Sequence, residues 1–199
     1  LSDAACAAPP ANISGSGTIT VNAKPTSVIS GTQTICSGAT SGNISIALTG
    51  TSPWDITYND GTTSTTINGN TANPYTFTVS PSSTKTYTVT ALSDLNCTAQ
   101  AGDKTGSATV TVDQLPLAIA GGSQTICQTG SATVSGASAP NGGTISWTHN
   151  GTGTLSNTTT LTPTYTPTAA DAGNMVTLTM TVTSNNTCGS ATALAYYSV

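Results

Sequence analysis

An internal repeat of 91 residues constrains the fold of this 199-residue chain more than any other feature. Two sets of cysteines keep that spacing: Cys6, Cys97 and Cys188 form one, and Cys36 and Cys127 form the other. The flanking residues follow the same offset, since Gln-Thr-Ile-Cys at 33–36 recurs at 124–127. Self-similarity at a fixed period means that the chain is a series of similar structural units.

The unit length and the residue patterns within a unit favour strands. About 90 residues is the size of a small β-sandwich domain. Trp54, Ile56 and Tyr58 alternate with polar residues before the turn residues 59–61, and Ile145, Trp147 and His149 do the same before Asn150-Gly151, a strong hairpin signal. No segment shows a helical period of 3.6 residues. We therefore expect an all-β chain of tandem sandwich domains with about seven short strands in each unit.

The repeat also predicts the domain boundaries. Residues 1–23 match the end of a unit, with a last strand at Thr18–Val21, and residues 24–113 and 114–199 form two further units. Lys24-Pro25 and Leu115-Pro116 mark the joints between them. These joints are short and contain proline, so we expect them to be semi-rigid.

The composition excludes several classes of protein. The chain has 44 Thr and 24 Ser, against three Lys, seven Asp and neither Arg nor Glu. Binding of nucleic acid needs clustered basic charge, which three scattered lysines do not supply. No apolar run approaches the roughly 20 residues of a membrane helix, so no membrane insertion is expected. A surface of hydroxyl groups instead of charges should depend little on salt.

The cysteine spacing leaves more than one disulfide pairing open. Pairing within each unit joins Cys36 to Cys97 and Cys127 to Cys188, with 61 residues between partners in both cases. A closed loop of that length stabilises by about 4 kcal/mol on a chain-entropy model. The rival scheme joins Cys6 to Cys36 and Cys97 to Cys127, across the joints.

The odd number of cysteines adds a further expectation. In the within-unit scheme Cys6 has no partner in this chain and would pair beyond it, in another molecule, or remain a thiol. Disulfides would place the protein outside the cytoplasm.

No arrangement of residues points to catalysis, a cofactor or a metal. His149 is the single histidine, and its place at a strand end beside a turn favours a half-exposed structural residue over a catalytic base. Asp171 is the one carboxylate of the second unit, so a duplicated active site is excluded. Neither C-x-x-C nor a calcium-loop pattern occurs. Trp54 and Trp147 alternate with isoleucine and are expected in the core, not as sugar-stacking platforms.

Several runs of residues together resemble a known repeat type. These are residues 31–38, 52–61, 74–79, 86–90 and 94–97 of the first unit, with Ile145-Ser146-Trp147 and residues 184–188 in the second. They are similar to Ig-like and PKD-like modules of giant Bacteroidetes-type cell-surface adhesins, which are delivered by type IX secretion and include gliding-motility proteins. The resemblance implies a scaffold without catalytic residues, exposed on the bacterial surface.

Three functions are consistent with these observations. The first is a stalk or filament segment of a large adhesin, whose partners are neighbouring repeats of the same or an identical chain and, at the surface, glycans. The second is a self-assembling fibre subunit that uses strand addition through Thr18–Val21. The third is a carbohydrate-binding accessory module of a secreted enzyme.

Overall fold

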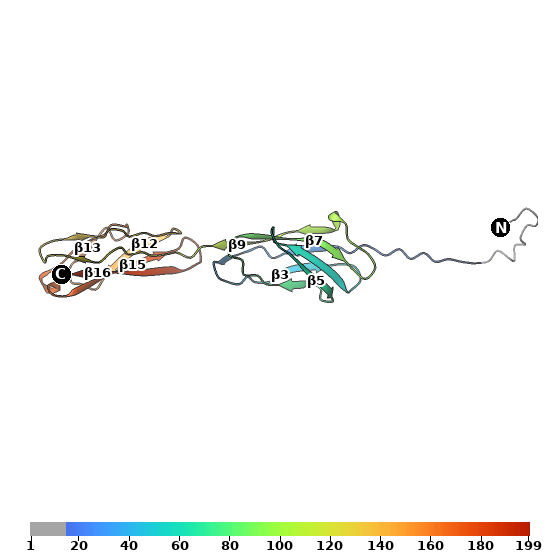
Figure 1. Ribbon diagram of the computed structural model, residues 1–199, viewed down its shortest axis with the longest axis horizontal. Coiled ribbons are helices and arrows are strands. Elements are labelled where there is room, and N and C mark those ends of the chain that lie inside the picture. The colour runs from blue at the N-terminus through green and yellow to red at the C-terminus, as the bar shows by residue number, and fades with distance from the viewer. Residues whose placement is uncertain (1–14) are drawn as a thin grey trace, which may run out of the picture.

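The structure is a computed structural model that describes residues 15–199. It consists of two β-sandwiches placed end to end, with an extended N-terminal segment that projects from the first (Figure 1). No helix among the described residues is long and apolar enough to cross a membrane. The prediction of an all-β fold is therefore confirmed.

The first domain has a four-stranded and a five-stranded sheet, in the orders β6-β3-β1-β8 and β2-β9-β7-β4-β5. A short 3-10 helix, η2, precedes β8. The elements are β1 (Ser27–Ser30), β2 (Gln33–Cys36), β3 (Ile44–Leu48), β4 (Trp54–Asn59), β5 (Ser64–Asn70), β6 (Tyr75–Phe77), β7 (Lys85–Ser93), η2 (Ala101–Asp103), β8 (Lys104–Gly106) and β9 (Ala108–Asp113).

The second domain has a four-stranded and a three-stranded sheet, in the orders β10-β16-β15-β12 and β11-β14-β13. Its elements are β10 (Gln124–Thr125), β11 (Ala132–Thr133), β12 (Thr144–His149), β13 (Thr154–Ser156), β14 (Thr164–Thr166), η3 (Ala169–Asp171), β15 (Met175–Thr183) and β16 (Ser190–Ser198).

The direction of the strands fixes which residues meet at each end of a domain. In the first domain β2 runs parallel to the last strand, β9, whereas β7 runs antiparallel to it. In the second domain β10 is parallel and β15 antiparallel to the last strand, β16. Both early strands, β2 and β10, therefore end where the chain leaves the domain, and both long antiparallel strands, β7 and β15, end where it enters.

Each domain has its own apolar core. Along β15 every second residue is buried, as a strand with one solvated face requires. Trp54 and Trp147 are 6% and 4% exposed, and their indole nitrogens donate hydrogen bonds to the carbonyls of Thr49 and Thr160 at 3.0 and 2.9 Å. The prediction that both tryptophans lie in the core is confirmed.

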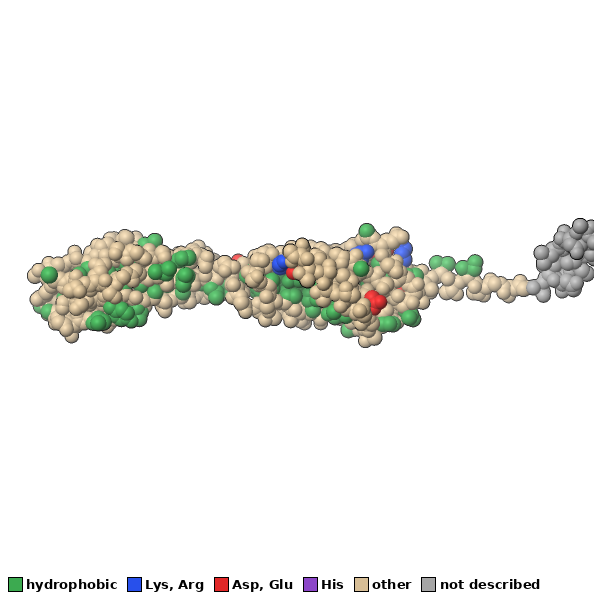
Figure 2. All heavy atoms as spheres, viewed as in Figure 1, with side chains coloured by type: hydrophobic (Ala, Val, Ile, Leu, Met, Phe, Trp, Pro, Cys, Tyr) green, Lys and Arg blue, Asp and Glu red, His purple; other side chains and the backbone are tan. Residues whose placement is uncertain are grey.

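The outer faces carry hydroxyl groups and few charges. Figure 2 shows a surface made mostly of backbone and of side chains that are neither hydrophobic nor charged, with the visible charged side chains over the first domain. From Gln114 to Val199 the single Asp, Glu, Lys or Arg is Asp171, which is 3% exposed. Exposed threonines pair across strands instead, as Thr86 with Thr109 and Thr133 with Thr164. The surface of the second domain is thus free of formally charged side chains.

The segment predicted to be the last strand of a preceding unit is extended but unpaired. Residues 15–26 form no strand, and Ile19 and Val21 are 90% and 88% exposed. The assignment of residues 1–23 to a preceding unit stays a prediction, and within residues 15–199 the segment Thr18–Val21 pairs with no strand. The reason is that β9 and β16 occupy the last-strand position of the two domains, which leaves this segment no sheet edge of that kind to join.

Candidate functional site, the junction between the two domains

A disulfide bond links the two domains to each other. It joins Cys36, the last residue of β2, to Cys188, in the turn between β15 and β16. The two Cα atoms are 5.5 Å apart, within the usual range, although the residues are 152 positions apart in the sequence. The bond therefore spans the joint between the domains instead of closing a loop inside one of them.

Both cysteines lie against the residue at which the chain leaves the first domain. Cys36 is opposite Asp113 in the β2–β9 ladder, and the amide of Ser37 donates a hydrogen bond to the Asp113 carbonyl at 2.8 Å. The Cys188 sulfur lies 3.9 Å from the same carbonyl oxygen. The side chain of Asn186 accepts a hydrogen bond from the Cys188 amide at 2.9 Å, which fixes the turn that presents the sulfur.

The backbone connection beside the disulfide is short and is attached to the second domain almost at once. β9 ends at Asp113, and the Leu115 carbonyl already accepts a hydrogen bond from the side chain of Asn141 at 2.9 Å. Pro116 is buried, and the amide of Leu117 donates to the carbonyl of Pro140 at 3.2 Å. Two covalent links and these hydrogen bonds therefore restrain the joint, and one residue, Gln114, separates the two anchored ends.

The structure does not contain either predicted pairing. Cys97 and Cys127 are free thiols, so neither Cys36–Cys97 nor Cys127–Cys188 forms, and the rival Cys97–Cys127 bond is absent as well. The physical reason is strand direction: β2 carries Cys36 to the exit end of the first domain, and β7 runs the other way toward Cys97. Cys6 lies outside the described residues.

This arrangement changes the path that a pulling force takes through the molecule. Without the bond, tension between Lys24 and Val199 passes through every strand of both domains. With the bond, the shortest covalent path runs from Lys24 along β1 and β2 to Cys36, crosses to Cys188 and leaves along β16. Residues 37–187 lie in a closed loop beside that path and cannot be extended by tension applied outside it.

A carboxylate orders the corresponding turn of the first domain, at its entrance. Asp94 accepts hydrogen bonds from the backbone amides of Thr51, Asn96 and Cys97 at 2.7–2.9 Å. These amides lower the pKa of the Asp94 carboxyl, the Thr51 amide most, because each donor favours the charged form. The turn that holds Cys97 is thus fixed by an ionised side chain.

The second domain holds a buried carboxylate with a structural role. Asp171 accepts hydrogen bonds from the amides of Thr152 and Thr168 at 2.8 and 2.9 Å, and from the Tyr165 hydroxyl at 2.8 Å. The Thr152 amide is the largest of the causes that hold its pKa well below the usual range. Both oxygens of this carboxylate accept hydrogen bonds that hold the β14–β15 connection to β14 and to the turn between β12 and β13, which is a structural role.

The single histidine lies at the end of β12, half-buried, as predicted. Its ring packs edge-on against Tyr165 with centroids 5.1 Å apart. Among the hydrogen bonds of residues 15–199 none joins His149 to a serine or threonine hydroxyl, so the geometry of a nucleophile–base pair is not formed there. The described residues also hold no cluster of three or more metal-ligating side chains.

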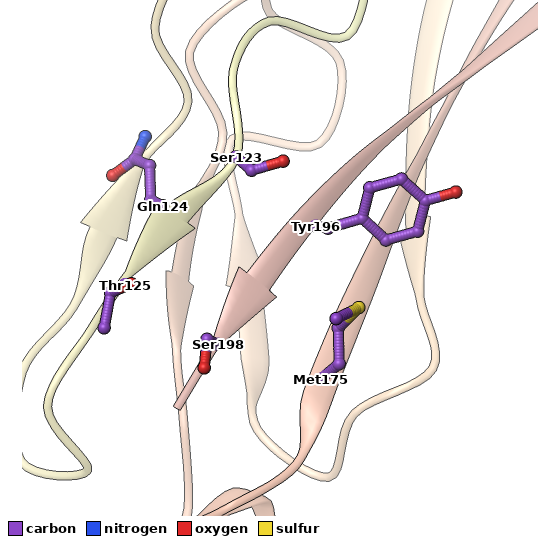
Figure 3. A pocket seen from close by; sticks show the side chains of 6 residues that line it. All are labelled: Ser123, Gln124, Thr125, Met175, Tyr196 and Ser198. Atoms are coloured by element: carbon purple, nitrogen blue, oxygen red, sulfur yellow. The ribbon is translucent and has the colours of Figure 1, made fainter.

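An exposed apolar patch on the second domain escaped the sequence interpretation. Met175, Leu194 and Tyr196 are 63%, 48% and 42% exposed on the outer face of β15 and β16. Met175 and Tyr196 line an open hollow of about 540 Å³ together with Ser123, Gln124, Thr125 and Ser198 (Figure 3). The adjacent pair Tyr196-Tyr197 could have predicted an exposed aromatic side chain in this patch. Successive strand residues face opposite sides of a sheet, so one of the two tyrosines has to point outward.

Comparison with known proteins gives the fold and nothing more specific. No family model matches the chain, and no curated protein matches it. Among solved structures, Drosophila N-cadherin EC1-4 has a TM-score of 0.51 at 11% identity, with 89% of this chain and 49% of that chain covered. This chain therefore spans about half of that structure.

Two further structures are similar at a lower score. Dpr11 IG1 bound to DIP-gamma IG+IG2 has a TM-score of 0.49 at 10% identity, covering 88% of this chain and 98% of that chain. The N-terminal eight Ig domains of Down Syndrome Cell Adhesion Molecule score 0.48 at 12% identity, covering 82% and 23%. The chain consists of two Ig-like β-sandwich domains of roughly 90 residues each.

Proposed function

We propose that this chain is a load-bearing stalk segment of a large bacterial cell-surface adhesin. The observation that carries the proposal is the Cys36–Cys188 bond, which gives the joint a second covalent link and takes residues 37–187 out of the path of tension. A disulfide of this kind persists in oxidising compartments, which supports an extracellular location. The resemblance of the repeats to Bacteroidetes-type surface modules supports the bacterial source, type IX delivery and a role in adhesion or gliding.

The surface chemistry supports the same role. A second domain without an exposed Asp, Glu, Lys or Arg keeps its surface interactions when the salt concentration changes, because its surface carries little charge to screen. The scaffold is non-catalytic in this proposal: the one histidine and the one carboxylate of the second domain are both occupied in packing.

The test is to locate and size the protein in the bacterium that produces it. Antibodies raised against residues 24–199 should label intact cells, and should reduce attachment or gliding. On a reducing denaturing gel the same antibodies should detect a polypeptide far larger than 19.6 kDa. Labelling that appears only after cells are broken open would contradict the proposal.

One observation favours a second candidate, a fibre subunit assembled by strand addition. The extended segment at Thr18–Val21 exposes two β-branched residues, Ile19 and Val21, with the spacing of a strand face. An exposed alternating segment of this kind can add to the sheet edge of another molecule. A native polypeptide of about 19.6 kDa that forms filaments would select this candidate over the stalk.

A further inference from the structure

The two free cysteines occupy the same positions as the two bonded ones, one unit away. Cys97 is 91 residues before Cys188, and Cys127 is 91 residues after Cys36. Cys97 and Cys188 both follow a long strand that is antiparallel to the last strand of the domain. Cys36 ends a strand that is parallel to the last strand, and Cys127 lies two residues beyond such a strand. Cys97 is therefore at the entrance of the first domain, and Cys127 at the exit of the second.

The surroundings of Cys97 repeat those of the bonded Cys188. The Cys97 sulfur lies 3.8 Å from the carbonyl oxygen of Asn22, as the Cys188 sulfur lies 3.9 Å from that of Asp113, and in each case 75 residues separate the pair. A side-chain oxygen accepts a hydrogen bond from each cysteine amide, at 2.7 Å for Cys97 and 2.9 Å for Cys188. The chain thus enters the first domain past Cys97 as it enters the second past Cys188.

The surroundings of Cys127 repeat those of the bonded Cys36. The Cys127 carbonyl accepts a hydrogen bond from the amide of Gly130 at 2.8 Å, and the Cys36 carbonyl accepts one from Ala39 at 2.9 Å. The same turn therefore follows both cysteines. Cys127 is exposed and Cys97 is half-buried, so a partner can reach both thiols.

We propose that Cys97 and Cys127 each form a disulfide with a neighbouring copy of this repeat unit, and that these bonds are of the same kind as Cys36–Cys188. Cys127 forms its disulfide with the entrance cysteine of a following unit, and Cys97 forms its disulfide with the exit cysteine of a preceding unit. A second copy of this chain supplies both, since Cys127 of one copy complements Cys97 of the next. The contact is head to tail and does not close on itself, so repetition gives a linear filament.

Bond formation needs an oxidant, and a disulfide compound supplies it. The Cys127 thiolate attacks glutathione disulfide, which forms a mixed disulfide and releases one glutathione thiolate. The Cys97 thiolate of the partner then attacks the Cys127 sulfur, forms the inter-unit bond and releases the second glutathione. Two thiols are oxidised and one glutathione disulfide is reduced, so electrons and atoms balance.

The experiment uses the 199-residue chain with Cys6→Ser, which removes the cysteine outside the described residues. Two variants of it are prepared, Cys97→Ser and Cys127→Ser. Glutathione disulfide is added to each variant separately and, in a third sample, to an equal mixture of the two variants. The mixture is expected to shift from 19.6 kDa to a dimer of about twice that mass on a non-reducing gel, and to stop there. Each variant alone is expected to remain monomeric, because it keeps either the entrance cysteine or the exit cysteine and not both.

Further measurements on the same samples make the result decisive. The parent with both thiols should form a ladder of higher oligomers, and peptide mapping of the dimer should find Cys97 linked to Cys127. Equal dimerisation of either variant alone, or no dimer in the mixture, would overturn the proposal. Circular dichroism confirms folding of each variant, and the intact Cys36–Cys188 bond keeps this test independent of the stalk proposal.

Discussion

Removal of the inter-domain disulfide should greatly lengthen the chain when it is stretched. In the oxidised protein, tension between the termini can extend the flanking segments Lys24–Cys36 and Cys188–Val199, each by at most about 40 Å. In the Cys36→Ser variant the 152 residue steps between the two cysteines also become extensible, which adds about 500–550 Å of contour length. The added length is therefore roughly 13 times that of either flank.

Single-molecule force spectroscopy with handles at both termini measures this length directly. The oxidised chain should show no unfolding step of domain size, whereas Cys36→Ser should show two, one for each sandwich. Cys127→Ser is the matched control, because it removes an equivalent cysteine that is not bonded and should behave as the oxidised chain does. Two domain-sized steps in the oxidised chain would refute the conclusion that residues 37–187 are not extended by tension.

Three further predictions follow from the same structure. The Cys36–Cys188 bond closes a single loop of 152 residues that contains parts of both domains, so Cys36→Ser should destabilise both domains, by about 5 kcal/mol in total on a chain-entropy model. Denaturant melts measure this loss, and a loss in one domain alone would contradict it. Asp94 and Asp171 have lowered folded pKa values, so stability should be constant down to about pH 5 and fall below about pH 4; Asp171→Asn should weaken that acid dependence in melts of the second domain, and an unchanged profile would count against it. Trp147→Ala should cost the second domain about 3–5 kcal/mol by the same melts, with the first domain unaffected.

Much of the architecture could be predicted from local patterns. The alternation of apolar and polar residues around Trp54 and Trp147 predicts which residues face the core, because a strand places successive side chains on opposite faces. His149 could likewise be assigned a structural role, because its place at a strand end beside a turn can be read from its neighbours in sequence. These properties depend on neighbours in sequence, which a repeat shows twice.

The disulfide could not be predicted, because its partners are set by the direction of strands far apart in sequence. The 61-residue spacing within a unit is compatible with a bond only if both cysteines reach the same end of the sandwich. The parallel pairing of β2 with β9 takes Cys36 to the opposite end from Cys97, and no local pattern records that pairing. The exposure of Tyr196 was missed for a related reason, since the face that each tyrosine of a pair occupies depends on the sheet register.

Disulfide mapping tests the central claim, the Cys36–Cys188 link, most directly. The chain has three lysines and no arginine, and trypsin does not cut between Lys24 and Pro25, so complete cleavage without reduction, after alkylation of free thiols, gives fragments 1–85, 86–104 and 105–199. The structure predicts that 1–85 and 105–199 stay linked while 86–104, with an alkylated Cys97, is released. The Cys6→Ser variant leaves Cys36 as the one cysteine of fragment 1–85. In that variant, recovery of 86–104 linked to 1–85 instead would show a Cys36–Cys97 bond and would contradict the inter-domain disulfide.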